Sequence, residues 1–435
     1  MRPRRSWCLC VFVIASWLGH SRATWAQTAA PSADQNGMAQ MSGNAMAMMT
    51  GPLDISDTRD GSGTAWLPDD SPMHAVMHQA GPWMLMLHGV AFVQYIATSS
   101  DRGDHQFGSV NWVMGMARRN VGEGSLTGRV MLSLEPLTVG RCGYPDLLQT
   151  GEVCSGAQLH DRQHPHDLFM EIAADYRRAL SSSVALELYG GPAGEPALGP
   201  VAYPHRPSAQ PDLVAPISHH WLDSTHVSFG VVTAALYGRV WKAEASVFNG
   251  REPDDQRYDI DLAPLDSYSG RVWLLPSPRW AFQFSAGHLK EAEIHPDAPR
   301  EDVNRITGSG TYHRLKGSQL WATTVAWGRN CETQVCTSAF LAETAVDLSM
   351  RDRWFGRAEV VGKTAQDLAL PLSASDVFTV GKIRGGYSRV VAAGRGISVS
   401  LGASVGLAFV PSSISPYYGR RSPAEAAVFL SVRPQ

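Results

Sequence analysis

The segment WMLMLHGVAFVQY, residues 83–95, decides the fold of this chain. Its odd positions carry lipid-compatible residues and begin and end on an aromatic, Trp83 and Tyr95, whereas its even positions include His88 and Gln94. Because side chains alternate between the two faces of a strand, one face of this segment is wholly apolar. Twelve strand residues tilted by about 40° rise about 30 Å, which is the spacing of the two aromatic girdles of a membrane barrel.

The same alternation recurs along the chain. In residues 126–135 the even positions are apolar or glycine, and the odd positions include Arg129 and Glu135. In residues 354–361 an apolar set that begins with Trp354 alternates with a set that includes Arg357. In residues 397–409 large apolar residues alternate with serine, glycine and alanine. A charge is tolerated where it faces water and is costly where it faces lipid, so the charged positions are expected to line an interior.

Sixteen segments of this kind are expected to be strands. They are 82–96, 107–119, 125–136, 168–178, 183–191, 224–237, 239–250, 267–276, 279–288, 303–314, 318–328, 338–350, 353–363, 376–391, 395–410 and 423–433. The gaps between them alternate between long and short, as the outer loops and periplasmic turns of an outer-membrane barrel do. A water-soluble sandwich or propeller would also alternate, but it gives no reason for the alternating loop lengths. We therefore expect an all-β fold, a transmembrane antiparallel up-and-down barrel of about sixteen strands (fourteen or eighteen if one hairpin is misassigned) over residues 81–435. Its location would be the outer membrane of a Gram-negative bacterium.

Composition excludes other classes. The 435 residues have 37 basic and 40 acidic side chains, a net charge of −3, which argues against a nucleic-acid partner. After the first thirty residues no uninterrupted apolar run reaches the 18 residues that a transmembrane helix needs.

The first 26 residues have the pattern of a secretory signal peptide: Arg2, Arg4 and Arg5, then an apolar stretch, then Thr24-Trp25-Ala26. After its removal four cysteines remain, and four cysteines allow three disulfide pairings. The pairs that close the shortest loops, Cys142–Cys154 and Cys331–Cys336, are the expected ones. Export and paired cysteines both indicate an oxidising compartment.

Residues 27–80 are rich in Gly, Ser, Asp and Met and are expected to form a flexible periplasmic segment. Thioether and imidazole groups suit copper, so this segment also contains candidate copper ligands. These ligands are Met46, Met48, Met49, Met73, His74, Met77 and His78. The alternative is a tail whose methionine content has no function.

Polar residues are densest in the expected outer loops, at residues 160–167, 204–207, 218–226 and 249–254. Three interpretations stay open for these loops. They fold inward and constrict the lumen through paired charges, or they bind a metal through His160, His164, His166, His219 and His220, or they form a surface hydrolase site. No nucleophile elbow, Walker loop, dinucleotide fingerprint or HExxH motif is present, so the chain lacks a specific enzyme motif and no catalytic residue is assigned.

The segments HDRQHPHD at 160–167, GEPALGP at 194–200 and FNGREP at 248–253 resemble a family of uncharacterised bacterial outer-membrane barrels. That resemblance covers most of the chain after Gly51 and implies fold and location but no activity. The methionine-rich segment that precedes a barrel is also similar in layout to the copper-resistance protein B family, although it has few His-Met repeats.

The expected function is a pore or substrate-selective channel with polar loops at its mouth. Sixteen strands enclose a lumen wide enough for water unless it is plugged. The expected pore-lining or constricting residues are Arg129, Glu135, Asp161, Arg162, Asp167, Arg206, Asp223, Arg251, Glu252, Arg271 and Arg357. Alternative functions are copper binding or copper resistance, with copper as the one suggested cofactor, and hydrolysis of membrane lipids. Expected partners are outer-membrane lipid, the barrel-assembly machinery, a small solute or metal ion, and further copies of the chain in a homotrimer.

Overall fold

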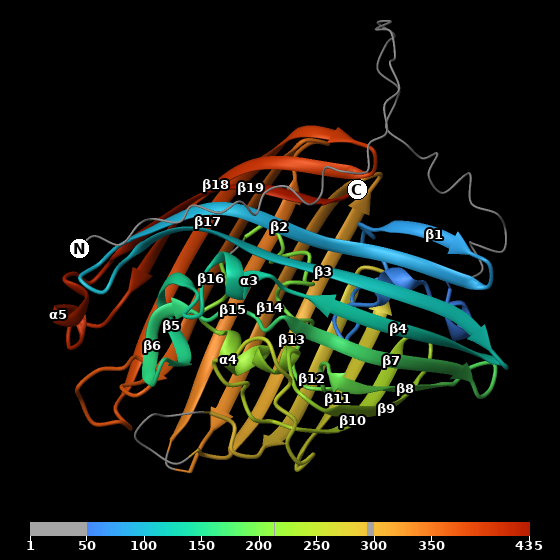
Figure 1. Cartoon of the computed structure of the whole chain (residues 1–435), viewed down its shortest axis with the longest axis horizontal. Helices are drawn as coiled ribbons and strands as arrows, with labels where there is room; N and C mark the ends of the chain where they lie inside the picture. Colours follow the sequence, from blue (N-terminus) through green and yellow to red (C-terminus); the bar gives the residue numbers. More distant parts are fainter. Residues whose placement is uncertain (1–49, 213, 294–299, 334) are drawn as a thin grey trace, which may run out of the picture. The chain divides into compact units, whose positions relative to one another are not determined.

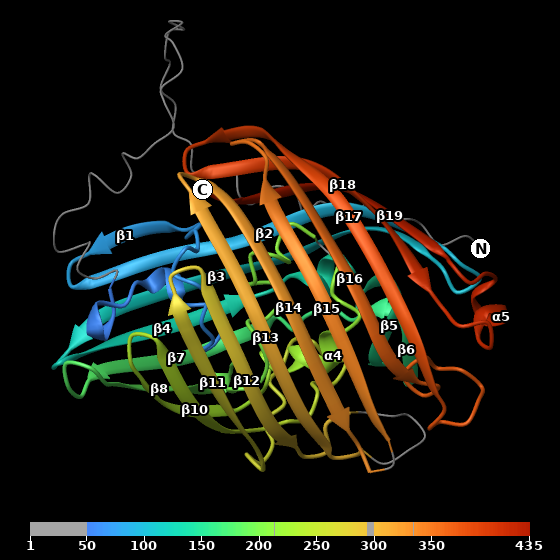
Figure 2. The same ribbon diagram turned by 180° about the vertical axis from the view of Figure 1, so that it is seen from behind.

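The strands pair in chain order and close into a barrel (Figures 1 and 2). The computed structural model describes residues 50–435 except residues 213, 294–299 and 334. Within this described part, sixteen antiparallel strands form the wall, and the last strand pairs with the first, from Ala424↔Ser99 to Val432↔Ala91. The predicted sixteen-stranded all-β barrel is confirmed.

The wall strands are β2 (Trp83–Ser99), β3 (His105–Val121), β4 (Gly124–Leu132), β7 (Phe169–Ala179), β8 (Ala185–Ala193), β9 (Val231–Tyr237), β10 (Trp241–Phe248), β11 (Ser267–Ser277), β12 (Trp280–Leu289), β13 (Val303–Lys316), β14 (Gln319–Cys331), β15 (Cys336–Asp347), β16 (Asp352–Thr364), β17 (Val377–Gly394), β18 (Ile397–Phe409) and β19 (Ala424–Pro434). Outside the wall, β1 (Val76–Ala80) pairs with β2, and β5 (Tyr144–Cys154) and β6 (Ala157–Gln163) form a separate two-stranded sheet. The short helices are η1 (Pro52–Asp54), η2 (Asp57–Arg59), α3 (Glu135–Thr138), α4 (His219–Leu222), η3 (Ser224–His226) and α5 (Ser415–Tyr418). Among the described residues, no helix is both long and apolar enough to cross a bilayer.

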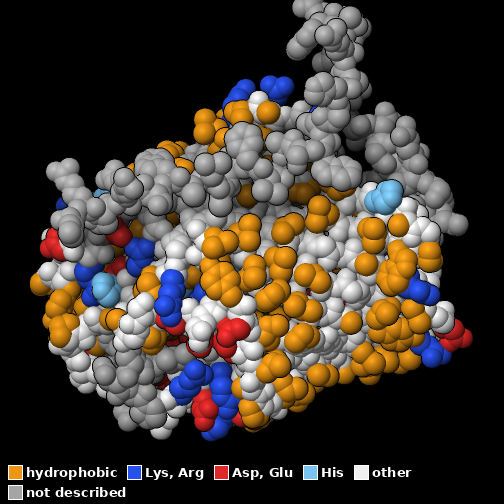
Figure 3. All heavy atoms as spheres, viewed as in Figure 1, with side chains coloured by type: hydrophobic (Ala, Val, Ile, Leu, Met, Phe, Trp, Pro, Cys, Tyr) orange, Lys and Arg blue, Asp and Glu red, His pale blue; other side chains and the backbone are white. Residues whose placement is uncertain are grey.

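Side-chain alternation places apolar residues outside and polar residues inside, as predicted. Val325 and Val405 are 57% and 66% exposed, while Arg129, Arg271 and Arg357 are buried. Figure 3 shows apolar side chains spread over the outer surface of the wall. A water-soluble protein does not expose an apolar surface of this extent, whereas a membrane barrel requires it.

Exposed aromatic residues gather near both ends of the strands. Near the short turns lie Trp241, Trp280, Trp321, Trp354 and Tyr387. Nearer the long loops lie Tyr95, Phe107, Tyr268, Phe340 and Phe409. These two sets are the girdles expected at the two membrane interfaces.

Most predicted strand boundaries differ from the structure by up to about three residues, and two differ by more. The strand expected over 125–136 ends at Leu132, and Glu135 lies on α3, because Pro136 cannot donate to a β-ladder. The strand expected over 224–237 begins at Val231, because Ser224–His226 forms a helical turn and Gly230 has a φ of +92°. The disulfides Cys142–Cys154 and Cys331–Cys336 are both formed.

Residues 56–72, here called the N-terminal plug, lie inside the wall at the end with the short turns. Arg129 of β4 donates to the Gly63 carbonyl at 2.6 Å, and Lys242 of β10 donates to the Thr64 carbonyl at 2.5 Å. The expectation that the whole of 27–80 is a flexible periplasmic segment is therefore wrong for these residues. They carry buried side chains such as Trp66, together with charges that pair with the wall.

Residues 194–228, here called the inner loop, enter the lumen from the opposite end. The loop connects β8 to β9 and carries α4, which lies between the front and back walls in both ribbon views (Figures 1 and 2). Ser208 is hydrogen-bonded to Thr324 of β14 at 2.8 Å, and the Trp221 indole donates to Thr337 of β15 at 2.8 Å. The lumen therefore holds two inserted segments, one from each end.

Candidate functional site

Prolines and one special glycine give the inner loop its shape. The loop contains Pro196, Pro200, Pro204, Pro207, Pro211 and Pro216. Proline fixes φ and removes a backbone donor, so such a chain cannot add a strand to the sheet and turns repeatedly instead. Gly199 has a φ of +87°, and a Cβ at this position would lie 2.0 Å from the Leu222 carbonyl oxygen. Glycine is therefore required where the two arms of the loop pack together.

Buried ion pairs tie the inner loop to the wall. The guanidinium of Arg206 lies 2.5 Å from Glu343 of β15 and 2.9 Å from Asp223 at the far end of the same loop. Arg384 of β17 donates to Asp212 at 3.1 Å. Arg206 is 1% exposed, so its charge is compensated by these carboxylates rather than by water.

Five histidines gather where α4 and η3 meet residues 164–167. The ring centroids of His166 and His226 are 5.1 Å apart, as are those of His219 and His226. The rings of His164 and His220 are 6.2 Å apart. A cavity at this cluster, here called the histidine chamber, is bounded by both acidic and basic groups. Its lining includes His164, His166, His219, His226, Glu252, Glu293 and Arg305.

One buried proton links two of the histidines. His226 Nδ1 lies 2.7 Å from the Asp223 carbonyl oxygen, which can only accept, so this nitrogen carries a hydrogen. His166 lies 3.0 Å from Glu135 through Nδ1 and 3.0 Å from His226 Nε2 through Nε2. Burial alone lowers the pKa of His166, but the charge and hydrogen bond of Glu135, together with Asp167, raise it overall. Since Nδ1 of His226 carries a hydrogen, its Nε2 accepts, and His166 Nε2 donates the hydrogen between the two rings.

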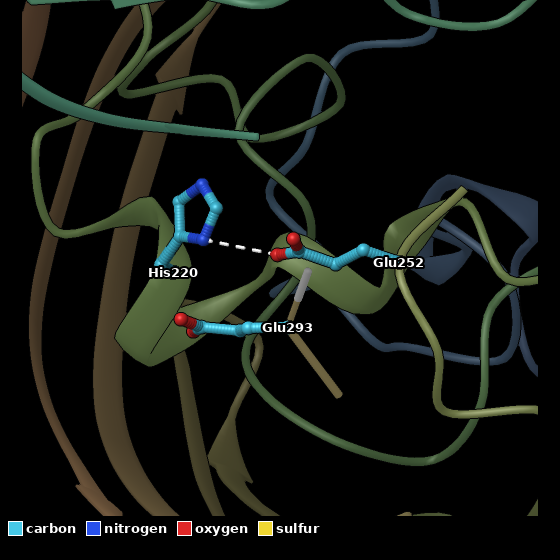
Figure 4. Close-up of side chains that lie close together, drawn as sticks. All are labelled: His220, Glu252 and Glu293. Atoms are coloured by element: carbon cyan, nitrogen blue, oxygen red, sulfur yellow. Dashed lines mark ion pairs between the residues drawn. The ribbon is translucent and has the colours of Figure 1, made fainter. Parts of the chain in front are cut away.

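A second group combines one imidazole with two carboxylates (Figure 4). His220 Nδ1 lies 3.2 Å from an oxygen of Glu252. Burial, followed by the charges of Lys363 and Arg305, lowers the pKa of His220 to about 3, so the ring is neutral. Burial, followed by the nearby Glu252 carboxylate, raises the pKa of Glu293 well above its ordinary value.

The structure divides the predicted metal ligands into separate places. His164, His166, His219 and His220 lie together, whereas His160 is on β6, where its half-exposed ring contacts Asp161. Its membership of one site with the other four is therefore wrong. Met77 and His78 lie on β1, with Met73 and His74 just before it, and Met46, Met48 and Met49 lie outside the described residues.

Every residue predicted to line or constrict the pore lies against a side chain of opposite charge or, for Glu135 and Glu252, against a histidine ring. These residues are Arg129, Glu135, Asp161, Arg162, Asp167, Arg206, Asp223, Arg251, Glu252, Arg271 and Arg357. Glu135 and Glu252 pair with histidines, and Arg162 and Arg251 lie nearer the surface, because their partners Asp104 and Asp266 are well exposed. Whether these residues control passage stays a prediction.

Sequence reasoning missed several interior charges. Lys242 and Glu244 of β10 contact Glu187 and Arg271, and Lys382 of β17 pairs with Asp146 and Glu425. The alternation within each strand could have found these wall residues, since they occupy the inward positions. Glu293 had no such signal, because it lies on a loop and becomes part of the group only through folding.

We expect acid to loosen the inner loop. Burial is the largest cause of the lowered pKa values of His164, His219, His220 and His226. A histidine whose pKa is lowered in the docked loop stabilises docking while the ring is neutral. This contribution is complete above pH 6.5, the ordinary pKa of histidine, and is lost as the pH falls below that value. His166, with a raised pKa, and Glu195, whose pKa burial raises to about 8, act in the opposite direction. They are outnumbered, because burial also lowers the pKa of His205 in the inner loop, to about 3.

Hydrogen exchange measures this effect in detergent-solubilised protein at pH 7.5 and pH 5, after correction for intrinsic rates. Amides of residues 200–226 should lose protection at pH 5, whereas those of β14 should not. Equal protection of the loop at both pH values would contradict the expectation.

The closed polar lumen and apolar outer belt define a transmembrane β-barrel of the bacterial outer-membrane class. Neither protein-family models nor curated protein sequences give a match. Among solved structures, OmpF of Salmonella typhi, in complex with daunomycin, is similar with a TM-score of 0.51, 10% identity, and coverage of 82% of this chain and 100% of OmpF. An anion-selective porin from Comamonas acidovorans has a TM-score of 0.49, 8% identity and coverage of 81% and 99%. The outer membrane channel DcaP of Acinetobacter baumannii has a TM-score of 0.47, 10% identity and coverage of 83% and 100%. At these identities the likeness concerns the fold alone.

Proposed function

We propose that this protein is a substrate-selective outer-membrane channel whose lumen is narrowed by the N-terminal plug and the inner loop. A barrel of sixteen strands without inserted segments encloses a water-filled passage. Here charged groups of the wall pair with both inserted segments, through Arg177–Asp60 at 2.8 Å and Arg206–Glu343 at 2.5 Å. This double anchoring of lumen segments by paired charges is the observation that carries the proposal.

The charged lining favours polar solutes over apolar ones. Water and polar solutes can replace part of the ion-pair network, whereas an apolar solute would leave buried charges without partners. A histidine chamber partway along the lumen adds groups that attract anions when they are protonated. The transported solute, the homotrimer and the copper-handling role stay predictions, and Cu(I) and Cu(II) calorimetry tests the last of these. Lipid hydrolysis also stays a prediction, tested by release of fatty acid from outer-membrane lipids.

Conductance in planar bilayers tests the channel. We expect the wild-type chain to give small, short-lived currents, and deletion of residues 52–71 to raise the single-channel conductance severalfold, because the plug occupies the lumen. The matched control is Arg389→Ala, which removes an exposed ion pair with Asp352 and leaves both inserted segments in place. Migration of unheated protein on denaturing gels verifies that each barrel is folded.

The proposal is wrong if neither the wild-type protein, nor the plug deletion, nor a variant with residues 200–224 replaced by a Gly-Ser turn carries any ion current.

A further inference from the structure

Three loops that are far apart in sequence bring one imidazole and two carboxylates together. His220 lies on α4 of the inner loop, Glu252 follows β10, and Glu293 follows β12 (Figure 4). One ligand atom from each of these residues lies within 4.8 Å of the others. Glu252 and Glu293 also line the histidine chamber, so the group borders a space that a further ligand can enter.

His220 is buried in an unusual way. Its side chain is 2% exposed, and among the described residues neither ring nitrogen has a hydrogen-bond partner, although Nδ1 lies 3.2 Å from a Glu252 oxygen. Buried polar atoms normally have partners, because an unsatisfied one costs about 1–3 kcal/mol. A neutral imidazole without a hydrogen bond, beside two carboxylates, is the arrangement of a ligand set that awaits a cation.

We propose that His220, Glu252 and Glu293 bind a divalent transition-metal ion of the Zn²⁺ type. One imidazole and two carboxylates are a common donor set for such ions, whereas Ca²⁺ takes oxygen ligands without imidazole. Bonds of about 2.0–2.2 Å in a tetrahedron place ligand atoms about 3.4 Å apart. His220 Nδ1 and the Glu252 oxygen already lie 3.2 Å apart, and no pair in the group exceeds 4.8 Å, so a small contraction suffices for binding. Because Glu252 and Glu293 line the chamber, water or a solute in the chamber can supply a fourth ligand.

Neighbouring charges permit this assignment. Arg305 lines the same chamber, but its guanidinium is held by Asn330 and Ser224, both at 3.0 Å. Lys363 is a second cation near His220, but the carboxylates of Glu252, Glu293 and Asp367 outnumber Lys363 and Arg305, so the site keeps a net attraction for a cation. His219, the neighbour of His220 on α4, is fixed by Asp223 at 2.7 Å, which holds this short helix in position.

Two other groups of side chains in the structure do not support a metal site in the same way. Asp254, Asp259 and Asp261 also lie within reach of a common ion, but they form an acidic cluster on a loop with exposed members and include no unpaired buried group. The facing nitrogens of His166 and His226 are satisfied by the proton between them. Both groups supply controls.

The test is a calorimetric titration of the EDTA-treated full chain in detergent with Zn²⁺. We expect one site with micromolar or tighter affinity, and at least tenfold weaker binding in His220→Ala and in Glu293→Gln, which keeps the side-chain volume. Asp259→Asn, His160→Ala and His226→Ala should retain the wild-type affinity, and excess Ca²⁺ should not compete. Co²⁺ in place of Zn²⁺ should give visible absorption that is lost in His220→Ala.

Migration of unheated protein on denaturing gels verifies the fold of each variant, and Glu293→Gln provides a second test if His220→Ala does not fold. The proposal is overturned if wild-type protein shows no saturable Zn²⁺ binding at millimolar concentration, or if binding survives both substitutions. Loss of binding in Asp259→Asn or His226→Ala, with retention in His220→Ala, would place the ion elsewhere and would also overturn it. Conductance is not measured here, so failure of the channel proposal leaves this test unaffected.

Discussion

Replacement of Arg206 by alanine should release the inner loop from the wall. The Arg206 guanidinium is buried between Glu343 on β15 and Asp223 at the far end of the loop, at 2.5 and 2.9 Å. Removing one partner of a buried pair leaves uncompensated charge and costs about 3–5 kcal/mol. Because 1.4 kcal/mol is about a tenfold change in an equilibrium, the undocked population should rise by a factor of about one hundred or more.

Limited proteolysis of protein in lipid vesicles measures this population, since cleavage within residues 200–226 requires an open loop. The control is Arg389→Ala, whose ion pair with Asp352 is exposed to water and therefore contributes little to stability. Equal cleavage rates in the two variants would show that the Arg206 pairs do not hold the loop.

Val325→Arg should impair assembly of the barrel. Val325 is 57% exposed and lies at the centre of β14, midway between the girdles. An arginine on the lipid-facing side at the bilayer midplane costs about 2–4 kcal/mol. The fraction of folded barrel after refolding into vesicles, and its free energy of unfolding in urea, should both fall.

Leu348→Arg is the matched control, because Leu348 is exposed in the short turn between β15 and β16, at the membrane interface. There the same change should cost about 0–1 kcal/mol. If Val325→Arg unfolds at the same urea concentration as Leu348→Arg, the face assigned to lipid is wrong.

The inward-facing residues of each strand could be predicted from that strand alone, but the residues with which they form ion pairs could not. Alternation alone places Arg129 and Arg357 inside, and both are buried. Nothing in the local sequence says that Arg129 meets Asp175 of β7, or that Arg357 meets Glu343 of β15. Those pairings follow from the register between neighbouring strands, which is a property of the closed sheet.

The histidines show a further limit of what the sequence can predict about side-chain contacts. His160, His164 and His166 are close in sequence, yet the backbone turns between them, and His160 lies against Asp161 while His166 meets His226, sixty residues away. Spacing in a loop does not predict direction, because loops lack the fixed period of a strand. A group of histidines chosen because they are close in sequence therefore includes some that line the histidine chamber and some that lie elsewhere.

By itself, the sequence predicted the barrel, about sixteen strands, the lipid-facing side of its clearest strands and the disulfide pairing that closes the shortest loops. These depend on a period of two and on loop length, which are local properties. Only the tertiary structure decided that residues 56–72 and 194–228 fill the lumen, and that His220, Glu252 and Glu293 meet. The physical reason is that these contacts join segments far apart in sequence, either from the two ends of the barrel or from separate outer loops, and their positions exist only once the sheet has closed.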